Sequence, residues 1–160
     1  MRRLALIAAF ALIPHLAGAA TYRLGNLEAG QPWSRPAVAG TNGVGYVTLA
    51  NRGKAPDTLV KIESPLAAKV EMHRTTMTGN VMSMQKQEKV SLPAGGQVVF
   101  GPSGYHLMLM GLTRTLKAGD EIPATLIFAS GARVKIAFAV GEGLGPPKTT
   151  AADSMAGMKH

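Results

Sequence analysis

Short runs of alternating apolar and polar residues, separated by turn-forming residues, make up the chain after its first twenty residues. Glycine, proline, asparagine and aspartate interrupt these runs every few residues, and no stretch keeps a helical apolar period for long. This spacing is typical of β-sandwiches and β-barrels. The pattern predicts strands near residues 45–50, 57–64, 69–75, 81–90, 96–100, 106–110, 121–128 and 134–140.

The N-terminal segment has a different composition from the rest of the chain. Two arginines precede an apolar run over residues 4–13, and the small residues 17–20 follow. A charged start, a short apolar segment and an A-x-A pattern predict a secretory signal peptide over residues 1–20, cleaved after Ala19 or Ala20. The apolar run is too short to cross ~30 Å of hydrocarbon as a helix, so we expect no membrane span after cleavage.

The rest of the chain divides into a domain and a tail. Residues 21–142 carry the strand pattern, and 160 residues in total are enough for one domain with a real core. Residues 143–160 are rich in glycine, proline, threonine and alanine, which predicts a flexible tail.

Cysteine is absent from the chain. Disulfides, blue-copper centres, thiol redox motifs and structural zinc knuckles all need a thiol, so the sequence excludes them. A lipoprotein needs an acceptor cysteine as well, and we therefore do not expect one.

Basic residues outnumber acidic ones, with a formal charge of +8 that becomes +6 when the two leader arginines are removed. These residues are spread along the chain without clusters or interleaved aromatics, so we expect no binding to nucleic acid. A solvated basic surface that favours an acidic partner fits better.

Histidine and methionine occur together in this sequence. The chain has nine methionines, and outside the leader its histidines are His73, His106 and His160. His73 follows Met72, and each of the other two has methionines within five residues. Histidine is scarce here, so this repeated proximity indicates a shared role.

The segment around His106 shows how such residues would be arranged on a strand. Side chains alternate between the two faces of a strand. One face therefore carries Leu107 and Leu109, as a core face does. The other face carries His106, Met108 and Met110, where a purely structural strand would more often present lysine, threonine or glutamate. We expect the imidazole and the first thioether to reach a common point.

A hairpin would bring a second histidine and methionine together. Alternation places His73 on the polar side of its strand, away from the core. If the loop consists of residues 78–79, His73 lies directly opposite Met84, with Cβ atoms ~5 Å apart. A loop of residues 79–80 shifts the pairing by one diagonal step and keeps both side chains on one face, whereas a three-residue loop separates them. Met82 shares the face of Met84 and is the competing ligand.

These residue types favour copper. Thioether sulfur is soft, neutral and free of a proton, which suits Cu(I), and imidazole binds copper in either oxidation state. A zinc site would normally also contain cysteine or carboxylate ligands. We therefore expect a shallow Cu(I) site whose donors a partner can displace one at a time. The alternative is that the methionine-rich face provides soft packing or a protein contact.

The spacing of these four residues resembles a known family. His73, Met84, His106 and Met108 reproduce the signature H-x10-M-x21-H-x-M of the periplasmic copper chaperones called PCu(A)C, without gaps. The flanking segments 45–49, 71–73 and 104–109 are similar too, and the likeness runs from about residue 33 to residue 140.

The resemblance implies a cupredoxin-like Greek-key β-sandwich or barrel that lacks blue-copper ligands. It also implies a periplasmic, non-enzymatic copper chaperone that carries Cu(I) on His73, Met84, His106 and Met108. Such proteins deliver copper to the dinuclear copper site of a cytochrome c oxidase subunit, directly or alongside Sco-type thiol proteins. We expect the carrier to be a monomer.

Some members of the family carry a C-terminal extension with methionine and histidine that is associated with Cu(II). Met155, Met158 and His160 resemble a short version, which would be a secondary metal site. The alternative is a tail that binds nothing.

Other functions stay open from the sequence alone. A copper storage or resistance protein would use the same ligands without delivery. A secreted β-sandwich without metal would keep its role when His106 or Met108 is replaced. A copper oxidase or a hydrolase is disfavoured because the chain has no cysteine, no clustered carboxylate pair and no serine nucleophile motif.

Overall fold

The computed structural model describes residues 20–143 and 145–146. The predicted leader lies outside the described residues, except for Ala20. So does most of the predicted tail, with Met155, Met158 and His160. The leader, the tail boundaries and the secondary metal site stay predictions.

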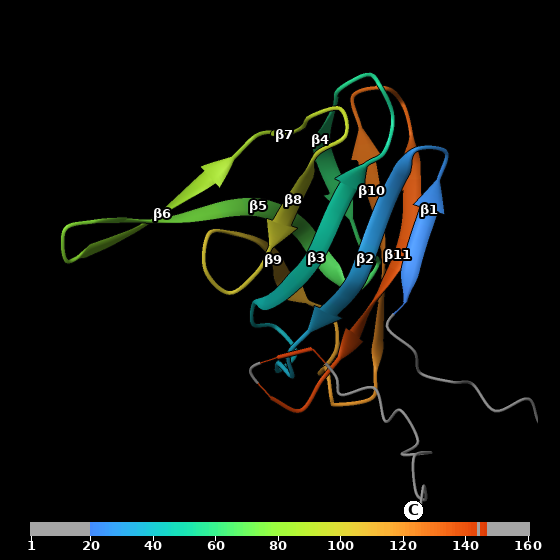
Figure 1. Ribbon diagram of the computed structural model, residues 1–160. Helices are drawn as coiled ribbons and strands as arrows, with labels where there is room; N and C mark the ends of the chain where they lie inside the picture. The colour runs from blue at the N-terminus through green and yellow to red at the C-terminus, as the bar shows by residue number, and fades with distance from the viewer. Residues whose placement is uncertain (1–19, 144, 147–160) are drawn as a thin grey trace, which may run out of the picture.

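The described residues form an all-β structure (Figure 1). None of them belongs to a helix that could cross a membrane. The strands are β1 (Thr21–Leu24), β2 (Leu27–Ser34), β3 (Gly43–Asn51), β4 (Asp57–Glu63), β5 (Ala67–Thr78), β6 (Val81–Gln87), β7 (Val90–Leu92), β8 (Gln97–Phe100), β9 (Tyr105–Leu112), β10 (Glu121–Phe128) and β11 (Arg133–Val140).

The strands form one continuous sheet that folds over on itself. Its order is β6-β5-β9-β8-β3-β2-β11-β10-β4-β7, with β1 paired to β2 and a further pairing of β9 with β3. Because β4 also contacts β5, the far half of the sheet returns to cover the near half. In Figure 1, β4 and β10 lie behind β3 and β2, which gives the two layers of a sandwich. The predicted β-sandwich is therefore confirmed.

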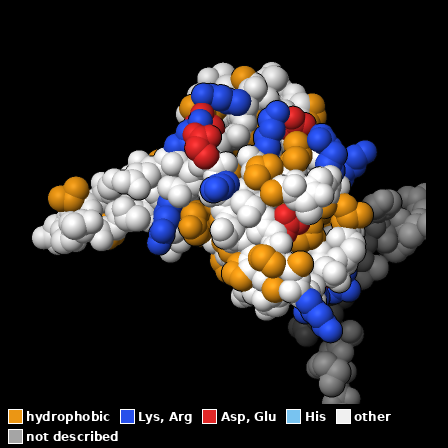
Figure 2. Space-filling view, turned by 90° about the horizontal axis from the view of Figure 1, so that it is seen from above, with side chains coloured by type: hydrophobic (Ala, Val, Ile, Leu, Met, Phe, Trp, Pro, Cys, Tyr) orange, Lys and Arg blue, Asp and Glu red, His pale blue; other side chains and the backbone are white. Residues whose placement is uncertain are grey.

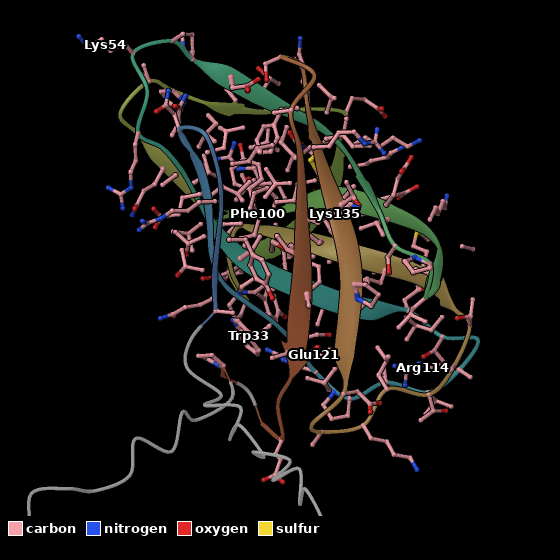
Figure 3. All side chains as sticks on the ribbon, turned by 90° about the vertical axis from the view of Figure 1, so that its right-hand side faces the viewer. Trp33, Lys54, Phe100, Arg114, Glu121 and Lys135 are labelled. Atoms are coloured by element: carbon pink, nitrogen blue, oxygen red, sulfur yellow. The ribbon has the colours of Figure 1, made fainter. Side chains whose placement is uncertain are left out.

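The core lies between the two layers and is filled by alternate residues of their strands. Phe100, Leu109, Leu126 and Phe138 are all essentially inaccessible to solvent. Figure 3 shows Phe100 among the side chains enclosed by the strands, while Lys54 lies at the periphery. Burial of these apolar side chains is the main stabilising contribution available to a domain without disulfides.

Two parts of the structure differ from the strand prediction. β1 and β2 were not predicted, because Gly30, Gln31 and Pro32 interrupt the apolar alternation of β2. The structure accommodates them with a register shift between Gly30 and Trp33, where Gln31 adopts a φ of 49°.

The single strand predicted over residues 81–90 is wrong, since the structure divides this segment into β6 and β7. β6 pairs with β5, whereas β7 pairs with β4 at the opposite end of the strand order. One alternating segment thus forms β6 at one edge of the sheet and β7 at the other.

The hairpin of β5 and β6 projects from the sandwich. Pairing of β5 with β9 ends at Arg74, and beyond that residue β5 pairs only with β6. We call residues 75–84 the arm. In Figure 1 this hairpin reaches out to the left of the sandwich, and Figure 2 shows hydrophobic side chains at its far end.

Candidate metal site

The loop of the hairpin fixes how β5 and β6 pair. It consists of residues 79 and 80, with Thr78 opposite Val81. Gly79 has a φ of +61°, as the first central residue of a type II′ turn requires. His73 therefore pairs with Lys86. The alternative with residues 78–79 in the loop, which puts Met84 directly opposite, is wrong.

The observed register is the one predicted for a loop of residues 79–80. It places His73 and Met84 diagonally across the two strands and keeps both on one face. Met84 lies opposite Thr75, two residues along β5 from His73. Directly opposed residues of antiparallel strands present their side chains on the same face, and so do residues two apart in one strand. Met84 and His73 therefore share a face.

Strand β9 contributes the other two predicted residues to the same face. His106 lies directly opposite His73, and Met108 lies directly opposite Glu71. The two imidazole rings have centroids 5.8 Å apart. Three adjacent strands thus bring the four predicted positions together on one surface. Their role as metal ligands stays a prediction.

The opposite face of β5 and β9 belongs to the core, as predicted. Met72 and Leu107 are buried there. The polar face is less open than expected, however, since His106 is only 7% exposed and the side chain of His73 only 15%. Alternation reports which face a side chain occupies, but neighbouring strands and loops decide how much of that face they cover. Met84 is 53% exposed, so the site is open on the β6 side.

Glu71 contacts His73, and the sequence predicted no role for it. Its carboxylate lies 3.0 Å from Nε2 of His73, 2.8 Å from Nζ of Lys69 and 3.8 Å from Nζ of Lys86. The hydrogen bond from Lys69, followed by that from His73, lowers the pKa of Glu71 from 4.5 to about 2. The available signal was its position two residues before His73, which places both side chains on one face.

The contact with Glu71 fixes which nitrogen of His73 carries a proton. An ionised carboxylate only accepts hydrogen bonds, so Nε2 is the donor. In the neutral ring the lone pair then lies on Nδ1. Nδ1 is buried and has no hydrogen-bond partner among the described residues. A buried acceptor without a partner is costly, and a bound metal ion would satisfy it.

The hydrogen bond of His106 fixes the other tautomer, with the proton on Nδ1. Its Nδ1 lies 3.2 Å from the carbonyl oxygen of Gly104, which can only accept. Nδ1 therefore carries the proton, and in the neutral ring Nε2 presents the lone pair. The same carbonyl accepts the backbone N–H of Thr75 at 2.9 Å. Gly104 has a φ of +98°, which favours glycine at this position.

The arrangement offers soft, neutral donors. Two imidazole lone pairs share one face with the thioethers of Met84 and Met108. In the part of the chain that the structure describes, no three His, Cys, Asp or Glu side chains gather as a metal-binding group. Imidazole and thioether donors match Cu(I), and Glu71 places a negative charge next to them.

Comparison with known proteins gives the family and the fold. Residues 27–140 match the LpqE-like family, described as putative lipoprotein LpqE-like. A putative lipoprotein of Leifsonia xyli subsp. xyli is 29% identical over 115 residues, which are 71% of this chain and 69% of that protein. The 160 residues here contain no cysteine, so this kind of lipidation has no acceptor thiol among them.

Solved structures with the same fold are PCuAC domains and a related copper protein. The apo PCuAC domain of PmoF2 has a TM-score of 0.67 at 23% identity, with 81% of this chain and 100% of that chain covered. The Cu(I) form of DR1885 from Deinococcus radiodurans has a TM-score of 0.55 at 30% identity. That match covers 69% of this chain and 78% of that chain. These matches confirm the predicted cupredoxin-like β-sandwich. The chain thus belongs to the LpqE-like family and has the fold of PCuAC domains.

Proposed function

We propose that this protein is an exported copper carrier that binds Cu(I) through His73, Met84, His106 and Met108 and transfers it to a partner. The observation that carries the proposal is the buried Nδ1 of His73, which has no hydrogen-bond partner within residues 20–143 and 145–146 and lies opposite His106, on one face with both methionines. Two similar solved structures support it, a copper-bound PCuAC domain of PmoF2 and a Cu(I) form of DR1885.

Copper is the cargo in this proposal, and the chemistry is ligand exchange without catalysis. In the neutral tautomers His73 donates through Nδ1 and His106 through Nε2. All four donors are uncharged, so the ion keeps its single positive charge and favours a site with a polar edge. Met84 is the most exposed of the four side chains, so an incoming donor from a partner would displace it first.

The proposed recipient is either the cytochrome c oxidase subunit that holds the dinuclear copper site or a Sco-type thiol protein. Lys86 is exposed directly opposite His73 on the face of the site and would face an acidic surface on such a partner. The predicted leader and the description of relatives as putative lipoproteins support export, and we place the protein in the periplasm.

The ligand set is tested by exchanging methionine for leucine at two positions. Met84→Leu keeps the fold because the side chain is exposed, and should weaken Cu(I) binding by more than about tenfold. Met72→Leu is the matched control, since Met72 neighbours His73 in sequence but points into the core. Competition with a Cu(I)-chelating dye measures both affinities. Wild-type affinity in Met84→Leu would falsify the four-ligand set.

Delivery is tested separately from binding. The Cu(I)-loaded protein is mixed with the metal-free copper domain of a cytochrome c oxidase subunit, and the metal on each protein is measured after separation. We expect copper to move to the oxidase domain. Retention of copper by a protein that binds it tightly would contradict delivery and favour storage.

A further inference from the structure

The far end of the arm carries a pair of methionines that the proposed copper site does not use. Met77 lies directly opposite Met82 across the hairpin, and their exposed fractions are 61% and 69%. Cβ atoms of directly opposed residues are about 4.5–5.5 Å apart. Two long, unbranched thioethers at that separation can reach one ion.

These sulfurs lie on the same face as the proposed copper site. Met84 follows Met82 by two residues in β6, and Thr75 opposite it precedes Met77 by two in β5. From the tip inward, this face carries first Met77 and Met82, then Met84, and then His73. No charged side chain stands between the tip and Met84 on either strand of this face.

Packing does not account for the two methionines at the tip. Both project into solvent, whereas a methionine that fills a core is buried, as Met72 is. The other face of the same segment carries Thr76, Thr78, Val81 and Ser83, none of which offers a sulfur donor. Thioethers therefore gather on the face that leads to the imidazoles.

We propose that Met77 and Met82 form an outer site for a soft monovalent cation, Cu(I), and pass the ion to Met84 and the inner site. This inference rests on the proposed function of the inner site. Each step replaces one neutral donor, a thioether or a neutral imidazole, by another, so the ion keeps its oxidation state and no proton is taken up or released. The arm thus provides an entry and exit route for copper.

The outer site is tested by nuclear magnetic resonance of the full chain with labelled methionine methyl groups. Ag(I) serves as a soft monovalent probe that does not change oxidation state under these conditions. The first equivalent should shift the methyl signals of Met84 and Met108, and further Ag(I) those of Met77 and Met82. The buried Met72 is the internal control.

The outcomes separate the two proposals. If Met77 and Met82 stay unshifted at several equivalents while Met84 and Met108 respond, the outer site is wrong and the inner site stands. If Met84 and Met108 do not respond, the proposed function fails, whatever the tip methionines do.

The relay is tested with the double variant Met77→Leu/Met82→Leu, which keeps an apolar tip of similar volume. Its Cu(I) affinity in dye competition should equal that of wild type, because the inner ligands are intact. Stopped-flow uptake of Cu(I) from the dye should slow several-fold. Uptake at the wild-type rate would overturn the relay.

Discussion

Each of the two imidazoles is held by one oxygen atom at a defined ring nitrogen. Glu71 accepts from Nε2 of His73, and the Gly104 carbonyl accepts from Nδ1 of His106. Such partners fix the tautomer and the orientation of a metal-binding ring before the metal arrives. In this protein the two rings would therefore use different nitrogens, Nδ1 of His73 and Nε2 of His106.

Removing the acceptor at residue 71 should weaken copper binding. Glu71→Ala leaves His73 free to rotate or to change tautomer, and we expect a loss of Cu(I) affinity of about tenfold. Glu71→Gln keeps an acceptor oxygen at the same place and should retain more of the affinity. Glu63→Gln, which neutralises a carboxylate outside the site, is the control. Nitrogen chemical shifts of the His73 ring report the tautomer directly, and identical shifts in wild type and Glu71→Ala would contradict this role.

The same carboxylate should affect stability in acid. The pKa of Glu71 is lowered from 4.5 to about 2 by Lys69 and His73, so its ionised form is favoured in the folded state. Its stabilising contribution is fully present above pH 4.5 and is lost as the pH falls toward 2. Between these values the wild type should lose more unfolding free energy than Glu71→Gln. Urea unfolding of both proteins across this range measures the difference, and parallel pH profiles would argue against it.

At the scale of strands, the elements that carry the proposed donors differ in how many neighbouring strands they pair with. Among the strands that the structure describes, β9 pairs with β5, β3 and β8, whereas β6 pairs with β5 alone and forms an edge of the sheet. A two-stranded ribbon alone is only marginally stable in water. His106 and Met108 thus stand on a fixed strand, and Met84 on a strand that opens more readily.

Hydrogen exchange should detect this difference and its change with metal. In the apo protein, backbone amides of residues 81–84 should exchange faster than those of residues 107–109. Cu(I) bound as proposed would join Met84 to the β9 donors, so exchange in the arm should slow while that of β9 changes little. Equal protection of the arm with and without Cu(I) would exclude Met84 as a ligand.

Which residues share a face was predictable, because the two-residue period of a strand is a local property. This is why His106 and Met108, and separately His73, were placed correctly on the face away from the core. The pairing register was not predictable, because it depends on where the turn begins. The pairing of Thr78 with Val81 decides between the two loops considered.

Features that depend on contacts between distant segments could not be predicted from the sequence. The burial of His106 depends on the strands around it, and the role of Glu71 depends on Lys69, Lys86 and His73 meeting at one carboxylate. β2 was missed because its bulge at Gln31 breaks the alternation that identifies a strand.

At the scale of the whole molecule, the two layers meet closely at Gly45 of β3. A methyl group added there would lie 3.1 Å from a ring carbon of Phe138 in β11 and 3.3 Å from Leu109 in β9. Both side chains are fully buried and have little room to move. The absence of a side chain at residue 45 therefore allows the observed spacing of the layers.

Gly45→Ala should destabilise the fold by about 1–3 kcal/mol, because the core must shift to accept the methyl group. Gly30→Ala is the matched control in β2, since its methyl group would meet only a carbonyl oxygen at an ordinary 3.8 Å. Its stability should equal or slightly exceed that of wild type. Urea unfolding monitored by circular dichroism measures both, and a Gly45→Ala protein as stable as Gly30→Ala would show that the layers adjust freely.

The Gly104 carbonyl accepts both the ring of His106 and the backbone N–H of Thr75 at the base of the arm. A mechanical connection results between the projecting hairpin and an imidazole on the face of β9 that points away from the core. A docking protein that bends the hairpin would move the Gly104 carbonyl and break its hydrogen bond with the His106 ring. Contact at the hairpin would then weaken the hold of His106 on a bound ion, so that recognition of the recipient and release of the ion would be coupled.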